Sequence, residues 1–501
     1  MRKIKRICAF IFGIIFACGG LAACAGEGAS MESSLDSTSA MEETVFSKYE
    51  DNQEFGFYSY GAPGTDDYSA NDAKIKQYVE AGFNRYMLLG CNGAKEAMSD
   101  WATSHRAINL ENARKYGVKD AVMRDYVLNS YARRDSGTLM MTDAELEELV
   151  TNRLGYYATA KNQDGSYAIQ GIDIGDEPWG RHYESYIRVY KMVLKVAREV
   201  YNRPDFQMYV CLLPAYGGMD LYTTNGEKAA EAERYSLYRQ YLRMYLEGTG
   251  AKKVAIDVYP YMGIGKYIRF ERGYYASLQI LAEECNRVGA TYALVAQTYS
   301  DPVQKDFRVV NEAEMKLQMN SLIGFGAKDI GFFRYEPLEN SYQPEAQFVG
   351  ADRITKTPIY DMAKKEIATA KKFDHIMLEY DYRASAIYTH DREKYAYYVA
   401  GVENDTFQKV NVTAGDGVTL VTELYDKKND LYMYMIQNVL DTVYTNDKVS
   451  KTTIKADFGD CTKVAVIFEG KTKIVELKQG IFKQELSTGE GVYVIPLKQE
   501  M

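Results

Sequence analysis

Residues 168–178, AIQGIDIGDEP, decide how the rest of the chain is interpreted. This stretch is a short apolar run that stops at two adjacent carboxylates and a proline, which cannot donate to a strand ladder. Seven other runs have a similar form: FGFYSYGAP from 55, NRYMLLG from 84, VKDAVMRDY from 118, FQMYVCLLP from 206, KVAIDVYPY from 253, TYALVAQTY from 291 and DIGFFRYEP from 329. The opening stretch is therefore the fourth of eight candidate strands.

Segments with helical periodicity lie between these runs. Examples are NDAKIKQYVEAG from 71 and LEELVTNRLGYYATA from 146, which follows a capping box made by Thr142 and Glu145. Eight strands that alternate with helices predict an α/β fold, the (β/α)₈ TIM barrel. A doubly wound open sheet is the competing fold, but it normally carries a Gly-rich phosphate loop after its first strand, and FGFYSYGAPG has none.

The pattern changes after residue 382. From 383 to 501 the chain shows short alternating runs with hairpin signals between them, such as DKKND and EGKT. This pattern predicts a small antiparallel β-sandwich after a barrel that spans 51–382.

The first residues predict export. Positions 2–6 hold four cations, positions 7–16 are almost purely apolar, and LAAC at 21–24 resembles the lipobox of bacterial lipoproteins. The resemblance implies a signal peptide over 1–23 and a lipid on Cys24. A transmembrane anchor is the alternative, but the apolar stretch is shorter than the roughly 20 residues that a spanning helix needs. Residues 24–50 are Ser-rich and acidic, which predicts a disordered tether. We expect an exported protein, lipid-anchored on the extracytoplasmic face of the cell membrane.

Composition narrows the class of partner. A formal net charge of -9 without a basic stripe argues against nucleic acid. The four cysteines beyond Cys24 are widely scattered and the four histidines form no ligand pattern, so we expect no metal site and no cofactor. The 44 tyrosines suit a partly apolar, hydroxylated ligand such as a carbohydrate, although they could equally be a compositional habit. Nothing in the sequence indicates an oligomer.

In a (β/α)₈ barrel, the active site is built at the C-terminal ends of the strands. The candidate catalytic carboxylates at the ends of the predicted strands are Asp176 and Glu177, Asp257, and Glu336. The other candidates at these strand ends are Trp179, Tyr259, Tyr261, Gln297, Tyr299, Arg334 and Tyr335. Two carboxylates that face each other across a cleft are what cleavage of a glycosidic bond requires, and aromatic rings can stack on sugar faces.

Several motifs carry a resemblance to a known group of enzymes. The motif GDEP followed by Trp179, the segments AGFNRYMLLG, DVYPY and LIGFGAKDIGFFRYEP, and the appended sandwich resemble (β/α)₈ glycoside hydrolases of the cellulase and β-galactosidase superfamily type. The resemblance does not assign the exact family. It implies that Glu177 at strand four is the general acid/base and that a nucleophilic Glu ends strand seven.

The chain departs from that pattern at two positions. Asp176 stands where the superfamily usually has Asn, and Gln297 stands where the nucleophile is expected. A neutral amide cannot be the nucleophile. Either Asp257 or Glu336 supplies the second carboxylate, or the enzyme inverts with a more distant water, or catalysis has been lost. Asp176 would repel ionised Glu177 and so help it to hold a proton.

Each candidate also has a purely structural interpretation. The Asp-Glu pair could cap the next helix, Trp179 could be a hydrophobic plug, and the tyrosines could pack the rim. The main rival function is a non-catalytic glycan-binding surface lipoprotein on a degenerate glycosidase barrel. A structural or adhesive surface protein is a third reading.

Overall fold

The computed structural model describes residues 45–49, 54–64, 69–91, 103–261, 273–300, 309–337, 347–408, 410–413, 417–440, 442 and 448–497. The predicted signal peptide and Cys24 lie outside these residues. Within them, the longest apolar helices still fall short of what a membrane crossing requires.

Eight parallel strands form one sheet in the order β1-β8-β7-β6-β5-β4-β3-β2. They are β1 Gly56–Ser59, β2 Arg85–Cys91, β3 Asp120–Asp125, β4 Gly171–Asp176, β5 Gln207–Leu212, β6 Lys253–Asp257, β7 Thr291–Gln297 and β8 Asp329–Phe333. Asn84 closes the sheet between β1 and β2, because its backbone donates to the Phe57 carbonyl at 3.1 Å and its side chain accepts from the Phe57 amide at 2.7 Å. The predicted (β/α)₈ barrel is confirmed.

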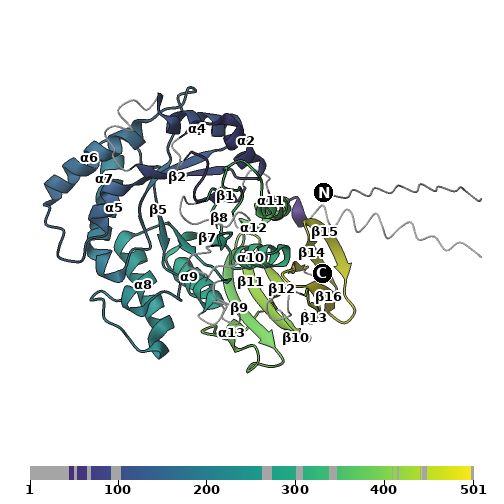
Figure 1. Ribbon diagram of the computed structural model, residues 1–501. Coiled ribbons are helices and arrows are strands. Elements are labelled where there is room, and N and C mark those ends of the chain that lie inside the picture. The colour runs from purple at the N-terminus through teal and green to yellow at the C-terminus, as the bar shows by residue number, and fades with distance from the viewer. Residues whose placement is uncertain are drawn as a thin grey trace, which may run out of the picture.

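Helices surround the barrel, as Figure 1 shows. They are α2 Asp72–Glu80, α4 His105–Lys115, α5 Tyr126–Ala132, α6 Asp143–Thr159, α7 Tyr183–Glu199, α8 Arg234–Thr249, α9 Tyr274–Val288, α10 Glu312–Gly324, α11 Pro358–Ala370 and α12 Asp374–Met377. The short 3₁₀ turns are η2 Gly180–His182, η3 Met219–Leu221 and η4 Glu231–Glu233. The capping box predicted for Thr142 and Glu145 begins α6.

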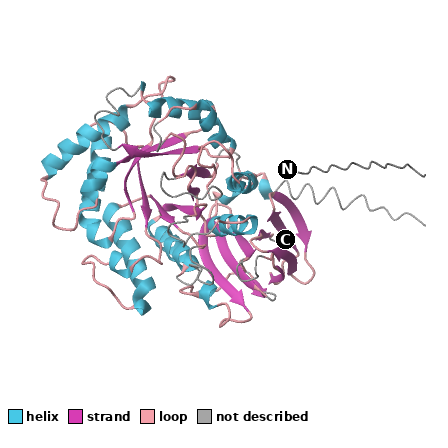
Figure 2. Cartoon of the chain, viewed as in Figure 1, coloured by secondary structure: helices cyan, strands magenta, loops and turns pink. Residues whose placement is uncertain are grey.

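The C-terminal part is an antiparallel β-sandwich, as predicted, and Figure 2 shows its strands beside the barrel. A six-stranded sheet has the order β15-β14-β17-β12-β11-β9, and a three-stranded sheet has the order β10-β13-β16. The elements are β9 Asp381–Thr389, α13 Ala396–Val399, β10 Asn411–Thr413, β11 Val418–Asp426, β12 Leu431–Asn438, β13 Lys451–Asp457, β14 Lys463–Phe468, β15 Lys471–Glu476, β16 Ile481–Ser487 and β17 Gly491–Pro496. Both hairpin signals lie at turns, between β11 and β12 and between β14 and β15.

The six-stranded sheet is buried on both faces. Tyr434 and Ile436 on β12 belong to the core between the two sheets, whereas Met433 and Met435 belong to the core that continues into the barrel. On the barrel side, the Gln437 side chain accepts from the Ser321 hydroxyl at 2.8 Å and donates to a carbonyl of α10 at 2.9 Å. The sheet therefore packs directly against the outer wall of the barrel.

Candidate active site

The end of β4 has an unusual backbone. Glu177 adopts a φ of 46°, in the left-handed region that side chains other than Gly rarely enter. Its amide donates to the Cys211 carbonyl of β5 at 2.8 Å, and the Tyr241 hydroxyl donates to the Pro178 carbonyl at 2.8 Å. Strained residues of this kind cluster at functional sites. Asp176 and Glu177 are both partly exposed at this turn.

An arginine from β3 holds two carboxylates of β4. The Arg124 guanidinium donates to Asp173 through Nε at 3.0 Å and Nη2 at 2.6 Å, and its Nη1 lies 3.4 Å from Asp176. Asp173 is 1% exposed. Burial raises its pKa, while the Arg124 charge acts in the opposite direction. Arg124 therefore fixes the carboxylate that precedes Glu177 on the rim.

Asp257, the last residue of β6, faces the same group of carboxylates. Its pKa lies well above its usual range, first because of burial and then because of the negative charges of Glu177 and Asp176. The Cys211 thiol of the intervening strand lies 3.7 Å from Asp257 Oδ1. The structure thus brings Glu177, Asp176 and Asp257 together across β5, and the two neighbouring charges add to the effect of burial on the pKa of Asp257.

Aromatic side chains line the barrel beside these carboxylates. The Phe333 ring lies 6.1 Å from Tyr60, 6.0 Å from Tyr259 and 5.4 Å from Tyr299, measured between ring centroids. The Tyr216 hydroxyl accepts from the Tyr259 amide at 2.6 Å, which anchors the segment after β6. These tyrosines are buried, so the structure shows them as packing beside Asp257, and their contact with a ligand stays a prediction.

Trp179 already stacks on its own chain. Its ring lies 5.2 Å from the His182 ring at an interplanar angle of 14°, and the Arg181 guanidinium lies 4.2 Å from its centroid. Asp135 contacts Arg181 at 3.0 Å and His182 at 3.4 Å. Burial, followed by the Arg133 charge, lowers the pKa of His182 to about 4, so its ring is neutral near pH 7. Trp179 is partly exposed, and its contact with substrate stays a prediction.

Gln297 is committed to the backbone of its neighbours. Its side-chain oxygen accepts from the Tyr261 amide at 2.9 Å, and its side-chain nitrogen donates to the Tyr261 carbonyl at 3.0 Å. The residue is fully buried, and Tyr261 is 1% exposed. Gln297 therefore ties the end of β7 to the segment after β6, and the place where a nucleophile was expected holds a structural cross-link.

The candidates after β8 form a separate buried group. Glu336 is fully buried, with Lys74 at 3.8 Å on one carboxylate oxygen and Arg353 at 3.8 Å on the other. Tyr335 stacks on Phe348 at 5.4 Å. Arg334 is 2% exposed and packs against Gly61, where a Cβ would collide with its guanidinium. Glu336 thus has two cations as neighbours, whereas the groups that act on Asp257 are Glu177 and Asp176.

Sequence reasoning missed several parts of this site. Arg124 and Tyr60 end predicted strands, and that position was the available signal. Asp173 and Tyr216 carried no comparable signal, because one lies inside β4 and the other follows β5. Within the described residues, no group of three His, Cys, Asp or Glu side chains is arranged to hold a metal ion.

The strand order and this rim define a (β/α)₈ barrel with carboxylates at the C-terminal ends of its strands. No family model matches the sequence, and no curated protein is significantly similar to it. Solved structures with a similar arrangement include a family 39 glycoside hydrolase from Bacteroides cellulosilyticus, 12% identical, covering 89% of this chain and 82% of that one, with a TM-score of 0.49. A family 27 β-L-arabinopyranosidase from Geobacillus stearothermophilus is 10% identical, covers 91% and 98%, and has a TM-score of 0.47.

An endo-β-1,4-mannanase from Thermotoga petrophila is likewise similar, at 11% identity, 87% and 98% coverage, and a TM-score of 0.41. These similarities concern the arrangement of the chain and carry no information about its site residues. The fold assignment rests on the strand order itself.

Proposed function

We propose that the chain hydrolyses a glycosidic bond in an oligosaccharide or polysaccharide, with Glu177 and Asp257 as its catalytic pair. The observation that carries this proposal is the grouping of carboxyl groups at the ends of β4 and β6, on either side of Cys211, whose carbonyl accepts from the Glu177 amide and whose thiol lies 3.7 Å from Asp257 Oδ1. The charges of Glu177 and Asp176 add to burial in raising the pKa of Asp257. Glycosidases need two carboxyl groups of which one is protonated and the other ionised at the working pH. Paired carboxyl groups whose environments separate their pKa values supply that difference.

The proton assignment follows from the same electrostatics. Because the pKa of Asp257 is raised above its usual range, we assign Asp257 as the member of the pair that donates a proton to the leaving oxygen. Glu177, at the rim end of β4, is then assigned as the second carboxyl group. This assignment reverses the roles that the resemblance implied, in which Glu177 is the general acid/base.

The remaining candidates take supporting roles in this proposal. Arg124 orients Asp176 beside the reacting sugar, and Tyr259 offers an aromatic wall next to Asp257. Glu336 is not included in the pair, since its carboxylate lies between Lys74 and Arg353. The proposal needs no cofactor, because proton transfer and carboxylate chemistry suffice.

The proposed cellular location is the one that the N-terminal residues predict. Cys24 carries a lipid, and the chain acts at the extracytoplasmic face of the membrane on carbohydrate. Radiolabelled palmitate that enters the wild-type chain and not Cys24→Ser supports this anchor, and equal labelling of both rejects it.

The rival function is glycan capture without hydrolysis. Trp179, already stacked on His182, and the tyrosine wall would serve binding equally well. The two functions differ in whether Glu177 is needed, since capture does not require an ionisable group at that position.

A glycoside panel tests the proposal. Purified full-length protein is incubated with 4-nitrophenyl glycosides and with glycan oligomers, alongside Glu177→Gln, Asp257→Asn and the exposed control Glu184→Gln in the first turn of α7. We expect hydrolysis by the wild type and the control, and its loss in both rim variants. Saturable binding without turnover by the wild type would establish the rival, and undiminished hydrolysis by Glu177→Gln would reject the proposed pair.

Azide distinguishes the two role assignments if the enzyme retains configuration. With a substrate that has a good leaving group, Asp257→Ala plus azide should give a glycosyl azide of the substrate's own configuration, because the nucleophile is still present. Glu177→Ala plus azide should give the inverted azide. The opposite pair of products would restore Glu177 as the acid/base.

A further inference from the structure

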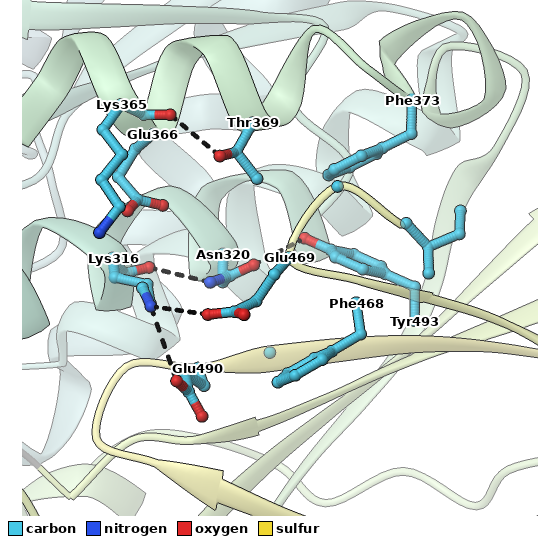
Figure 3. Close-up of a pocket in the computed structure, with 13 residues that line it drawn as sticks. Lys316, Asn320, Lys365, Glu366, Thr369, Phe373, Phe468, Glu469, Glu490 and Tyr493 are labelled. Atoms are coloured by element: carbon cyan, nitrogen blue, oxygen red, sulfur yellow. Dashed lines mark hydrogen bonds and ion pairs between the residues drawn. The ribbon is translucent and has the colours of Figure 1, made fainter. Parts of the chain in front are cut away.

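A cavity of about 290 Å³ lies on the outer wall of the barrel, where the sandwich packs against it. Figure 3 shows α10 and α11 on one side and the ends of β14 and β17 on the other. The cavity shares no lining residue with the carboxylate group at the strand ends. Its volume is at the lower end of small-molecule sites, about 300–1,000 Å³.

Glu366 of α11 is the unusual residue of this cavity. It is 6% exposed and lines the cavity, yet within the described part of the chain it makes no hydrogen bond or ion pair. Burial raises the pKa of its carboxyl, while Lys316 and Lys365 act in the opposite direction from beyond ion-pair distance. The carboxylate therefore presents acceptor oxygens to the cavity, to which a ligand hydroxyl can donate.

The other charges at the cavity are already paired. Lys316 lies 3.3 Å from Glu469 and 3.6 Å from Glu490, so its ammonium sits between two carboxylates at the cavity's edge. Lys365 pairs with Glu312, outside the cavity. Figure 3 shows Lys316 of α10 reaching Glu469 and Glu490 from the sandwich side, so donors and acceptors lie close together at this edge of the cavity.

Aromatic rings form the rest of the wall. Phe373 and Tyr493 lie 5.6 Å apart between ring centroids, and Phe468 projects from the end of β14. The Tyr493 hydroxyl donates to the Asn320 side-chain oxygen at 3.3 Å, and the Asn320 side-chain nitrogen donates to the Gly489 carbonyl at 3.1 Å. Asn320 is therefore held by the fold, and the unmet hydrogen-bonding capacity belongs to Glu366.

The charged groups at the cavity disfavour an anionic ligand. The lining holds three carboxylates, of Glu366, Glu469 and Glu490, against the two ammonium groups of Lys316 and Lys365, so an anion would meet a surplus of negative charge. A neutral hydroxylated molecule can use groups of both signs, because each hydroxyl can donate to a carboxylate and accept from an ammonium. An apolar face on the same molecule would match Phe373 and Phe468.

We propose that this cavity is a second carbohydrate site, which binds one neutral sugar ring without cleaving it. Glu366 accepts hydroxyl hydrogen bonds, Lys316 donates to a ring or hydroxyl oxygen, and the phenylalanines contact the C–H face. The site is independent of the proposed hydrolase activity.

Binding is measured on full-length Glu177→Gln, so that turnover is blocked, by saturation-transfer NMR titration. The neutral probes are D-glucose, D-galactose, D-mannose, D-xylose and L-arabinose. D-Glucosamine and D-glucuronate are the charged comparators. Neutral disaccharides test whether the ring at the end of a longer sugar also binds. At least one neutral sugar should saturate, and Glu366→Leu in the same background should weaken it by about tenfold or more. Phe468→Ala should weaken it as well, whereas Asp361→Asn, an exposed carboxylate of the same helix, should leave it unchanged.

Folding does not confound this test. Glu366→Leu removes a buried carboxylate that has no partner, so its melting temperature should equal or exceed that of its parent. A titration in which Glu366→Leu removes no saturable component would overturn the site, as would tighter binding of glucosamine or glucuronate, or the absence of saturation by every neutral sugar. Absence of glycosidase activity in the wild type would reject only the proposed function and not this site. If the wild type is active, Glu366→Leu should hydrolyse small substrates at the same rate.

Discussion

The carboxylates at the two ends of the barrel have different electrostatic surroundings: those at one end are paired with cations, and those at the other lie beside each other. At the N-terminal end, buried Asp329 contacts Arg85 at 2.5 Å and also pairs with Lys253, and Arg85 reaches Asp120 at 3.2 Å. At the C-terminal end, Asp176, Glu177 and Asp257 lie together, and the pKa of Asp257 is raised. A balanced cluster of charges stabilises the fold, whereas neighbouring carboxyl groups with a raised pKa mark a candidate functional site. Variants at the two ends should therefore fail in different ways.

The largest expected effect is on turnover at the C-terminal end. Replacing Glu177 by Gln should lower kcat/KM by about 100- to 10,000-fold, the range expected when a catalytic carboxylate is lost. The free energy of unfolding should change by less than about 1 kcal/mol, because the side chain is partly exposed and the amide has nearly the same shape. Steady-state kinetics and urea denaturation measure the two quantities. A variant that loses both equally would show that Glu177 acts through the fold.

At the N-terminal end, stability should suffer instead. Asp329→Asn leaves Lys253 and Arg85 without their buried partner, and we expect a loss of about 3–5 kcal/mol in the free energy of unfolding. Asp120→Asn is the matched control, because Asp120 is 33% exposed and Arg85 keeps Asp329. The control should cost less than about 1 kcal/mol. Equal losses in the two variants would contradict the central role of Asp329.

Arg124→Gln should show an intermediate effect that depends on pH. Without Arg124, buried Asp173 loses its cation, and we expect a loss of about 2–3 kcal/mol at neutral pH. The pKa of Asp173, already raised, rises further in the variant. Protonated Asp173 needs no cation, so the deficit should shrink as the pH falls through that raised pKa. Denaturation at several pH values tests this, and a deficit that stays constant down to acidic pH would argue against it.

The smallest expected effect is a gain in stability on replacing Asp257. The pKa of Asp257 is higher in the folded chain than in the unfolded chain, so its ionisation disfavours the folded state. That penalty is absent below the unfolded pKa of about 3.9 and grows as the pH rises toward the folded value. Asp257→Asn should thus be more stable than the wild type at neutral pH, by about 1 kcal/mol, with the gain disappearing near pH 4. Thermal unfolding across pH measures it, and a variant less stable than the wild type at pH 7 would refute the argument.

The sequence predicted which end of the barrel to inspect, because strand ends are visible as the points where apolar runs meet Pro, Asp or Glu. It could not show which side chains face inward there. The pairing of β4 with β5 shifts register between Asp173 and Asp176, so the two-residue alternation that would assign faces is interrupted. Arg124 could be seen at a strand end, but its bond to Asp173 depends on the register of β3 with β4, in which the two residues are direct partners.

Partners distant in sequence explain the other differences. Gln297 was assigned to the rim from its position, yet its amide bonds the backbone of Tyr261, which is 36 positions away. Glu336 followed a strand in the same way, and its neighbours Lys74 and Arg353 come from two other parts of the fold. Residue type and position predict where a carboxylate or amide lies, whereas its ionisation and exposure depend on these tertiary contacts.

The packing of the six-stranded sheet limits the construction of chimaeras with other barrel proteins. Met433 and Met435 belong to the same hydrophobic core as the barrel, and Gln437 makes hydrogen bonds to α10. The C-terminal strands therefore pack as part of the barrel's own structure and do not form an independent domain. A swap of these strands with those of another barrel would have to carry the matching outer surface of α10. Cutting the chain after residue 382 would expose that apolar surface to water, so we expect the truncated chain to fold poorly.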